Sequence, residues 1–316
     1  MFLFLYGDDS YRSGQKLNEI KAKFKEKTDP SGVNIVVFNG EDFNLEKFNN
    51  ASSQSGFLVA KRLIITKNLL AAKPKKELTE QLIELLKKLK ASENIYVFRE
   101  DSAPDKRTSL FKLLTQDKKS AQEFKALEYK QLEDWLKKYL NQAGTKMSPA
   151  GQELLLSFTE NNLWHLSNEL DKLIAYKKGQ EITEADVKEM VTSKAYENIF
   201  GLTDALAAGD QKKSLRLLQE QIQAGLNEQY ILTMIVRQFR ILAQLKPLVE
   251  QNYPEYQMVK ETKLHPFVVK KTLPQVKKFT LDKIKRIYSL LTDLDRKFKS
   301  TKLSPQTLID LFIMKI

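Results

Sequence analysis

The residues with the greatest chemical potential lie just after the first apolar run, in segment 7–16, which is GDDSYRSGQK. A phosphate-binding loop of the form G-x-x-x-x-G-K-[ST] holds a nucleotide through backbone N–H groups and its lysine. Here six residues instead of four separate the glycines, and Gln15 stands where the lysine should follow. Asp8 and Asp9 also place two carboxylates where a phosphate would be repelled. We therefore predict that the loop binds no nucleotide and that segment 8–10 caps a helix.

Other combinations of reactive residues also argue against catalysis. Segment 99–101, Arg-Glu-Asp, lacks the apolar-strand-then-Asp-Glu pattern of a magnesium site, and we interpret its acids as solvated charge at the end of a strand. His165 and His265 lack the spacing of zinc ligands. The chain contains no cysteine and no G-x-S-x-G motif that would supply a nucleophile. We expect no catalytic residue, no cofactor and no metal in this chain.

Length and composition limit the class of protein. A chain of 316 residues suggests two or three domains, and a hydrophobic content of 42% is enough to build their cores. The absence of cysteine fits a reducing compartment. The start, MFLFLYGDDSYR, lacks the features of a signal peptide, and no apolar run approaches the roughly 20 residues of a membrane span. We therefore expect a cytoplasmic protein.

The net charge of +12 is unevenly distributed along the chain. Residues 1–130 carry 24 basic and 18 acidic side chains, residues 131–195 carry 8 and 10, and residues 196–316 carry 20 and 12. Basic regions suggest an anionic partner, and nucleic acid is the usual one. A lysine-rich surface that only maintains solubility explains the same composition, so charge alone does not decide between the two.

Strands and helices alternate over residues 1–130, where they must position any site. Four short runs have the character of buried strands, namely 2–6, 33–38, 63–66 and 95–98, and a last strand is expected over 121–127. Four segments between them have helical spacing: 10–27, 43–50, 77–90 and 109–115. Strands that alternate with helices form a mainly parallel sheet with helices on both faces. The first domain is therefore predicted to be of the α/β class.

The rest of the chain is predicted to be all-α. Four short helices over residues 131–195 form a small module, and longer amphipathic helices fill residues 196–316. Start signals such as Ser148-Pro149 and Ser304-Pro305 mark where helices begin. We expect the helix over 228–246 to end before Pro247, because proline has no N–H to donate.

Segment 55–66, SGFLVAKRLIIT, joins a short apolar tip to a predicted strand. Segment 56–59, Gly-Phe-Leu-Val, forms the tip, and Lys61-Arg62 leads into the strand. Two large apolar side chains next to a strand are either part of the core or a protruding plug that fills a pocket of a partner. The residue types alone leave both interpretations open.

Taken in order, these segments give the chain a resemblance to a known family. FLFLYGDDSY, GFLVAKRLIIT and NNLWHLSNELDKLIAY are similar to motifs of the delta subunits of the bacterial DNA polymerase III clamp loader. NIFGLTDALAAGDQKKSLRLLQEQIQAG is similar to the pattern that opens the C-terminal domain of these subunits, and VRQFRIL and KLHPFVVKK continue it. The resemblance spans nearly the whole chain.

The resemblance implies an AAA+-like fold with three domains: an α/β domain over 1–130 that carries the tip, a helical lid over 131–195, and a helical collar over 196–316. It implies a subunit without ATPase activity that binds the beta sliding clamp and helps to open it for loading onto primed DNA during replication. The implied partners are the clamp, the delta prime and gamma/tau subunits through the collar, and primer-template DNA, with no membrane. Such a chain has no catalytic site of its own but belongs to a nucleotidyltransferase holoenzyme, DNA polymerase III.

The clamp-binding residues that the resemblance implies are Gly56, Phe57, Leu58 and Arg62. Many relatives have a proline and a second phenylalanine at the tip, where this chain has Gly56 and Leu58, and both changes keep an apolar plug. Arg62 either shapes the turn or pairs with an acidic residue of the clamp. Two other functions stay as alternatives: an active P-loop-like ATPase and a stand-alone DNA-binding protein.

Overall fold

The computed structural model describes residues 1–53, 61–159, 162–191, 193–223 and 225–316. The chain divides into two compact units, Met1–Leu127 and Glu128–Ile316. The predicted fold class, a parallel α/β domain followed by helical domains, is confirmed. The predicted boundary between 195 and 196 lies inside the helix Ser193–Ala208. The division of the second unit into a lid and a collar stays a prediction.

The first unit is built on a five-stranded sheet whose order is β2-β3-β4-β1-β5. All neighbouring strands are parallel. The described strands are β1 (Phe2–Tyr6), β2 (Ile35–Asn39), β3 (Leu63–Lys67), β4 (Ile95–Arg99) and β5 (Ala121–Glu123). The first strand therefore lies between two strands that come much later in the sequence.

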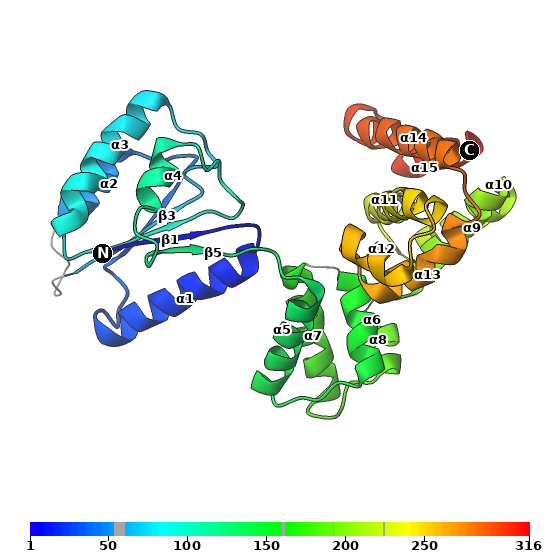
Figure 1. Ribbon diagram of the computed structural model, residues 1–316, viewed down its shortest axis with the longest axis horizontal. Helices are drawn as coiled ribbons and strands as arrows, with labels where there is room; N and C mark the ends of the chain where they lie inside the picture. Colours follow the sequence, from blue (N-terminus) through cyan, green and yellow to red (C-terminus); the bar gives the residue numbers. More distant parts are fainter. Residues whose placement is uncertain (54–60, 160–161, 192, 224) are drawn as a thin grey trace. The chain divides into compact units, whose positions relative to one another are not determined.

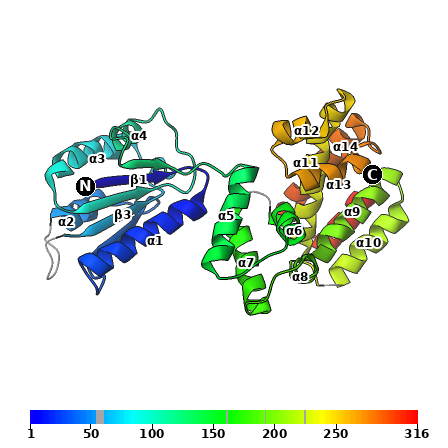
Figure 2. The same ribbon diagram turned by 60° about the horizontal axis from the view of Figure 1, so that its bottom comes forward.

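Helices cover both faces of this sheet, as Figures 1 and 2 show. They are α1 (Ser10–Lys27), α2 (Leu45–Ser53), α3 (Lys76–Lys88) and α4 (Ser109–Leu114), with a 3₁₀ turn η1 (Leu89–Ala91) after α3. Side chains of α1 pack with Leu63 and Ile65 of β3, whereas Ile64 packs with α2, α3 and α4 on the opposite face. Because both faces are buried, the strands are continuous apolar runs and not alternating ones.

The second unit is entirely helical apart from one isolated bridge between Met147 and Ile182 in its described part. Its helices are α5 (Tyr129–Gln142), α6 (Pro149–Thr159), α7 (Leu163–Lys177), α8 (Glu184–Met190), α9 (Ser193–Ala208), α10 (Gln211–Gln223), α11 (Glu228–Glu250), α12 (Glu255–Thr262), α13 (Pro266–Val276), α14 (Leu281–Ser300) and α15 (Pro305–Met314). The predicted starts at Ser148-Pro149 and Ser304-Pro305 are confirmed, since each serine side chain accepts a hydrogen bond from the first turn. The largest core cluster of the unit joins helices α9 to α15.

The prediction that the helix over 228–246 ends before Pro247 is wrong, because α11 continues through the proline to Glu250. A proline removes one N–H, but the following turn can still close. Here the N–H of Gln251 donates to the carbonyl of Pro247 at 3.0 Å, and the N–H of Tyr253 donates to Leu248 at 2.9 Å. Packing of Leu242 and Leu245 in the core holds the preceding turns in place.

None of the helices in the described ranges is both long enough and apolar enough to cross a membrane.

A buried histidine lies at the start of α13. The Nδ1 atom of His265 accepts a hydrogen bond from the N–H of Phe267 at 3.1 Å and so caps the helix. The ring lines a small cavity together with Arg237 and Lys263. Burial lowers the pKa of His265 to about 4, although the negative charge of Glu133 opposes part of this shift. The folded protein therefore favours the neutral imidazole.

We expect this histidine to make the second unit less stable in acid. Between about pH 6.5 and pH 4 the unfolded chain binds a proton at His265 that the folded chain does not. The contribution of His265 to the free energy of unfolding therefore rises with pH in this window and is constant above it. The free energy of unfolding should fall by roughly 2–3 kcal/mol from pH 7 to pH 4 through this residue. Urea unfolding followed by tryptophan fluorescence measures it, because both tryptophans, Trp135 and Trp164, lie in the second unit.

The variant His265→Asn keeps a side chain that can cap a helix but removes the titrating group. It should reduce the loss of stability in acid; His165→Asn, at an exposed histidine, is the control for removing an imidazole from the same unit. An equal pH dependence in His265→Asn and the wild type would show that this residue does not cause the effect.

Candidate functional site

The loop after β1 packs against the chain's own backbone where a nucleotide-binding protein would hold phosphate. Gly7 has a φ of +129°, a backbone conformation that residues with a side chain rarely adopt. A Cβ atom at this position would lie 2.3 Å from the carbonyl oxygen of Phe124. The N–H of Asp9 donates to the same carbonyl at 2.9 Å. The first glycine of the loop is therefore required by a close backbone contact with the segment after β5.

The start of α1 is capped from within the chain, as predicted for segment 8–10. The Oδ1 atom of Asp9 accepts a hydrogen bond from the N–H of Arg12 at 2.9 Å. The other carboxylate oxygen pairs with Nε of Arg12 at 2.5 Å, and this arginine also donates to the carbonyl of Lys125. A helix N-terminus can bind an anion through its free N–H groups. Here a carboxylate of the chain already occupies that position.

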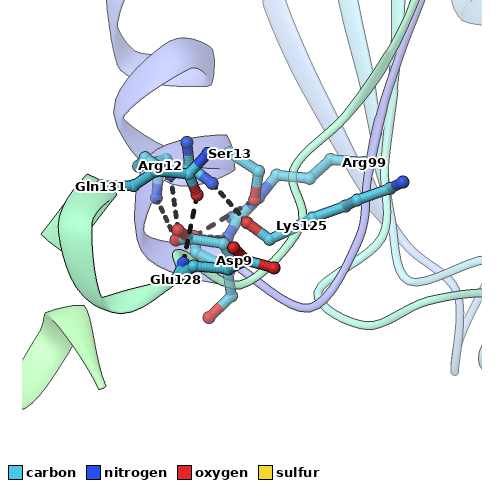
Figure 3. A network of polar contacts seen from close by, with 8 residues as sticks. Asp9, Arg12, Ser13, Arg99, Lys125, Glu128 and Gln131 are labelled. Atoms are coloured by element: carbon cyan, nitrogen blue, oxygen red, sulfur yellow. Dashed lines mark hydrogen bonds and ion pairs between the residues drawn. The ribbon is translucent and has the colours of Figure 1, made fainter. Parts of the chain in front are cut away.

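Arg99, at the end of β4, completes this network (Figure 3). Its Nε donates to Oγ of Ser13 at 3.2 Å, and its Nη2 donates to the carbonyl of Ser10 at 2.9 Å. Gly14 lies next to this guanidinium, and a Cβ there would lie 3.3 Å from it, slightly closer than an ordinary contact. Asp101 forms an ion pair with the same guanidinium. Gly7 thus has a structural role in the backbone contact with Phe124, and Gly14 lies beside the guanidinium that bonds to the start of α1.

The acids that follow β4 stabilise a neighbouring loop. Glu100 is 1% exposed, and its two carboxylate oxygens accept hydrogen bonds from the N–H groups of Leu70 and Ala71 at 2.9 and 3.0 Å. Burial raises the pKa of Glu100, and these backbone donors oppose the shift. Asp101 accepts a hydrogen bond from the Asn68 side chain. The interpretation of both acids as solvated charge is therefore wrong for Glu100.

Within the described ranges, no group of three or more His, Cys, Asp or Glu side chains could hold a metal ion. The absence of a metal site stays a prediction for the chain as a whole.

The predicted clamp-binding residues lie between α2 and β3. Gly56, Phe57 and Leu58 fall outside the described residues. Arg62 is half-buried immediately before β3, where its N–H donates to Oδ1 of Asn94 at 2.8 Å and its carbonyl accepts from the N–H of Ile95 at 2.9 Å. The backbone of Arg62 is thus fixed to the sheet, whereas a contact with a clamp stays a prediction.

The sequence does not predict the roles of two residues in this region. Arg99 contacts Ser13 across a separation of 86 positions, and Asn94 contacts Arg62 across 32 positions. Neither belongs to a motif, and an asparagine before a strand is most often part of an ordinary turn. The one local sign of a structural role for Asn94 is its position as a polar residue directly before an apolar strand.

Comparison with known proteins gives consistent results for both units. The family model for the DNA polymerase III delta subunit matches residues 3–127, and the model for its C-terminal domain matches residues 196–316. The DNA polymerase III subunit delta of Bacillus subtilis is 28% identical in an alignment that covers 99% of this chain and 91% of the relative. The probable DNA polymerase III subunit delta of Aquifex aeolicus is 25% identical over 78% of this chain and 71% of its own length.

A solved structure shows the same fold. The structure of the Bacillus subtilis DNA clamp loader delta protein superimposes with a TM-score of 0.60 at 24% identity. The match covers 99% of this chain and 94% of the solved chain.

Proposed function

Because the chain belongs to the delta-subunit family of the bacterial DNA polymerase III clamp loader, we propose that it binds the beta sliding clamp and helps to open it for loading onto primed DNA. The family places the chain in DNA replication and in the DNA polymerase III complex. The proposal adds a specific partner, and a mechanism in which the energy of binding at one site weakens a ring interface elsewhere.

The observation that best supports a role without ATP hydrolysis is the network around Arg99. Asp9 caps the first helix, and the Arg99 guanidinium bonds to Ser10 and Ser13 where a nucleotide's phosphates would need space and donors. Repulsion by Asp9 and the missing lysine both disfavour ATP at this position. In the proposed function, other loader subunits bind and hydrolyse ATP, and this chain contributes no catalytic centre to the holoenzyme.

The proposed contact with the clamp is formed by Gly56, Phe57, Leu58 and Arg62. Two large apolar side chains that enter a preformed pocket each contribute roughly 1.5–3 kcal/mol, before the cost of ordering the segment is subtracted. Arg62 either shapes the turn at the tip or pairs with an acidic residue of the clamp. This contact needs no covalent chemistry.

The remaining parts of the proposal concern assembly and location. We propose that the C-terminal domain joins the delta prime and gamma/tau subunits, and that primer-template DNA passes near basic regions of the chain. The excess of basic over acidic residues in 196–316 supports the binding of an anionic partner such as DNA near this domain. The cytoplasm is the proposed location.

Reconstitution tests this function. Loader subunits with and without this chain are mixed with the beta clamp, ATP and singly primed circular DNA, and clamps retained on the DNA are counted. We expect loading to require the chain. We also expect the isolated chain to bind the clamp without ATP and to give no heat when titrated with Mg-ATP.

Two outcomes would favour the alternatives. Binding and hydrolysis of ATP by the isolated chain would indicate an active ATPase. Tight, strongly salt-dependent binding of duplex DNA, together with normal clamp loading when the chain is omitted, would indicate a stand-alone DNA-binding protein.

A further inference from the structure

The side chain of Asn94 joins the two described ends of the α2–β3 connection. Its Nδ2 donates to the carbonyl of Ser52, in the last turn of α2, at 3.0 Å. Its Oδ1 accepts from the N–H of Arg62, just before β3, at 2.8 Å. Asn94 is 6% exposed, so both bonds lie in a largely dehydrated environment. One side chain thus holds together two backbone positions that are separated by residues 53–61.

The amide group suits this task because it carries a donor and an acceptor in one plane. An aspartate could only accept, and an aliphatic side chain could do neither. Asn94 is itself held in place, because its N–H donates to Oγ of Ser92 and the following residue, Ile95, bonds to the carbonyl of Arg62. The position of the bridge is therefore set by the β3–β4 pairing and does not depend on the side chains at 52 and 62.

We propose that Asn94 is a positioning residue for clamp binding, which acts by fixing the distance and orientation of the two ends of the connection that carries Phe57 and Leu58. This inference rests on the proposed function. A segment whose ends are already fixed loses less conformational freedom when it binds a partner. Asn94 does not itself contact the clamp; its two bonds are both to backbone groups of this chain.

A matched control lies at the other end of the same strand. Glu100 follows β4 as Asn94 precedes it, is also buried, and also bonds two backbone groups, those of Leu70 and Ala71. Asn94→Ala and Glu100→Ala therefore each leave two backbone groups without their side-chain partner. Both variants should lower the stability of the first unit, but only Asn94→Ala should weaken clamp binding.

The test measures the Kd for the beta clamp with the full chain, by surface plasmon resonance well below the unfolding temperature of each variant. We expect about a tenfold higher Kd for Asn94→Ala and a change of less than about twofold for Glu100→Ala. A Kd for Asn94→Ala equal to that of the wild type, or an equal loss in both variants, would overturn the inference.

Two further variants remove ambiguity. If Asn94→Ala does not fold, Asn94→Asp provides the test, because it keeps the acceptor for the N–H of Arg62 and loses the donor to the carbonyl of Ser52. We expect Asn94→Asp also to raise the Kd for the clamp. A Kd equal to that of the wild type would overturn the inference. Phe57→Ala with Leu58→Ala tests the proposed function separately. Loss of binding in that double variant with normal binding by the Asn94 variants refutes only the role of Asn94, whereas normal binding by the double variant refutes the proposed clamp contact itself.

Discussion

Replacement of Phe57 and Leu58 together by alanine is expected to raise the Kd for the beta clamp by a factor of about 100 or more. Each side chain contributes roughly 1.5–3 kcal/mol when it is fully buried in a partner, and each 1.4 kcal/mol corresponds to about a factor of ten in Kd. Surface plasmon resonance with immobilised clamp measures the effect directly. We expect clamp loading to decline in parallel.

The same variant distinguishes a plug from a core segment. If the two side chains protrude, thermal unfolding followed by far-UV circular dichroism should be unchanged. If they instead belong to the core, loss of the phenylalanine alone should cost roughly 3–5 kcal/mol of stability. Val37→Ala serves as the control, because Val37 is a 44% exposed apolar residue on the edge strand β2 of the same unit. It should change neither clamp binding nor folding.

Substitution of Gly7 by alanine is expected to destabilise the first unit by roughly 3–5 kcal/mol. The new Cβ would overlap the carbonyl oxygen of Phe124, a backbone atom that cannot move without disturbing the segment after β5. The positive φ of Gly7 adds backbone strain to this overlap. Because both tryptophans lie in the second unit, tryptophan fluorescence should change little while circular dichroism shows early unfolding of the first unit.

Gly32→Ala separates strain from overlap. Gly32 lies in the same unit and also has a positive φ, but the nearest atoms to its added Cβ belong to the flexible end of the Lys25 side chain. We expect a loss of only about 1–2 kcal/mol there. Equal losses at both glycines would show that the contact with Phe124 contributes nothing.

Local patterns predicted the elements of the first unit well, because short apolar runs and helical spacing depend on neighbouring residues. The cap at Asp9 was predictable for the same reason. The hydrogen bonds of the Arg99 and Glu100 side chains were not predictable, since each side chain bonds to groups distant in the sequence that only the folded sheet brings close. The burial of Glu100 leaves no local signal, because its two donors come from a loop about 30 positions earlier in the sequence.

The continuation of α11 beyond Pro247 shows that a strong local signal can also give a wrong prediction. A proline is a strong local signal, yet packing of the preceding turns and the bonds of the following turn decide whether a helix continues. For the candidate site, family resemblance predicts Phe57 and Leu58, whereas no motif in the sequence predicts the role of Asn94. A bridge between two backbone groups leaves no constraint on the residue types at its ends, and therefore no motif.

The strand order also bears on how the protein is made. β1 leaves the ribosome before the other described strands, but it lies between β4 and β5, and its pairing partners extend to Glu123. β1 must therefore wait, unpaired and apolar, until β4 (Ile95–Arg99) has been synthesised, and its second edge waits for β5. Sheets with such distant pairings fold slowly and expose aggregation-prone segments on the way. We infer that the nascent N-terminal unit depends on protection of Phe2–Tyr6 until its partners arrive.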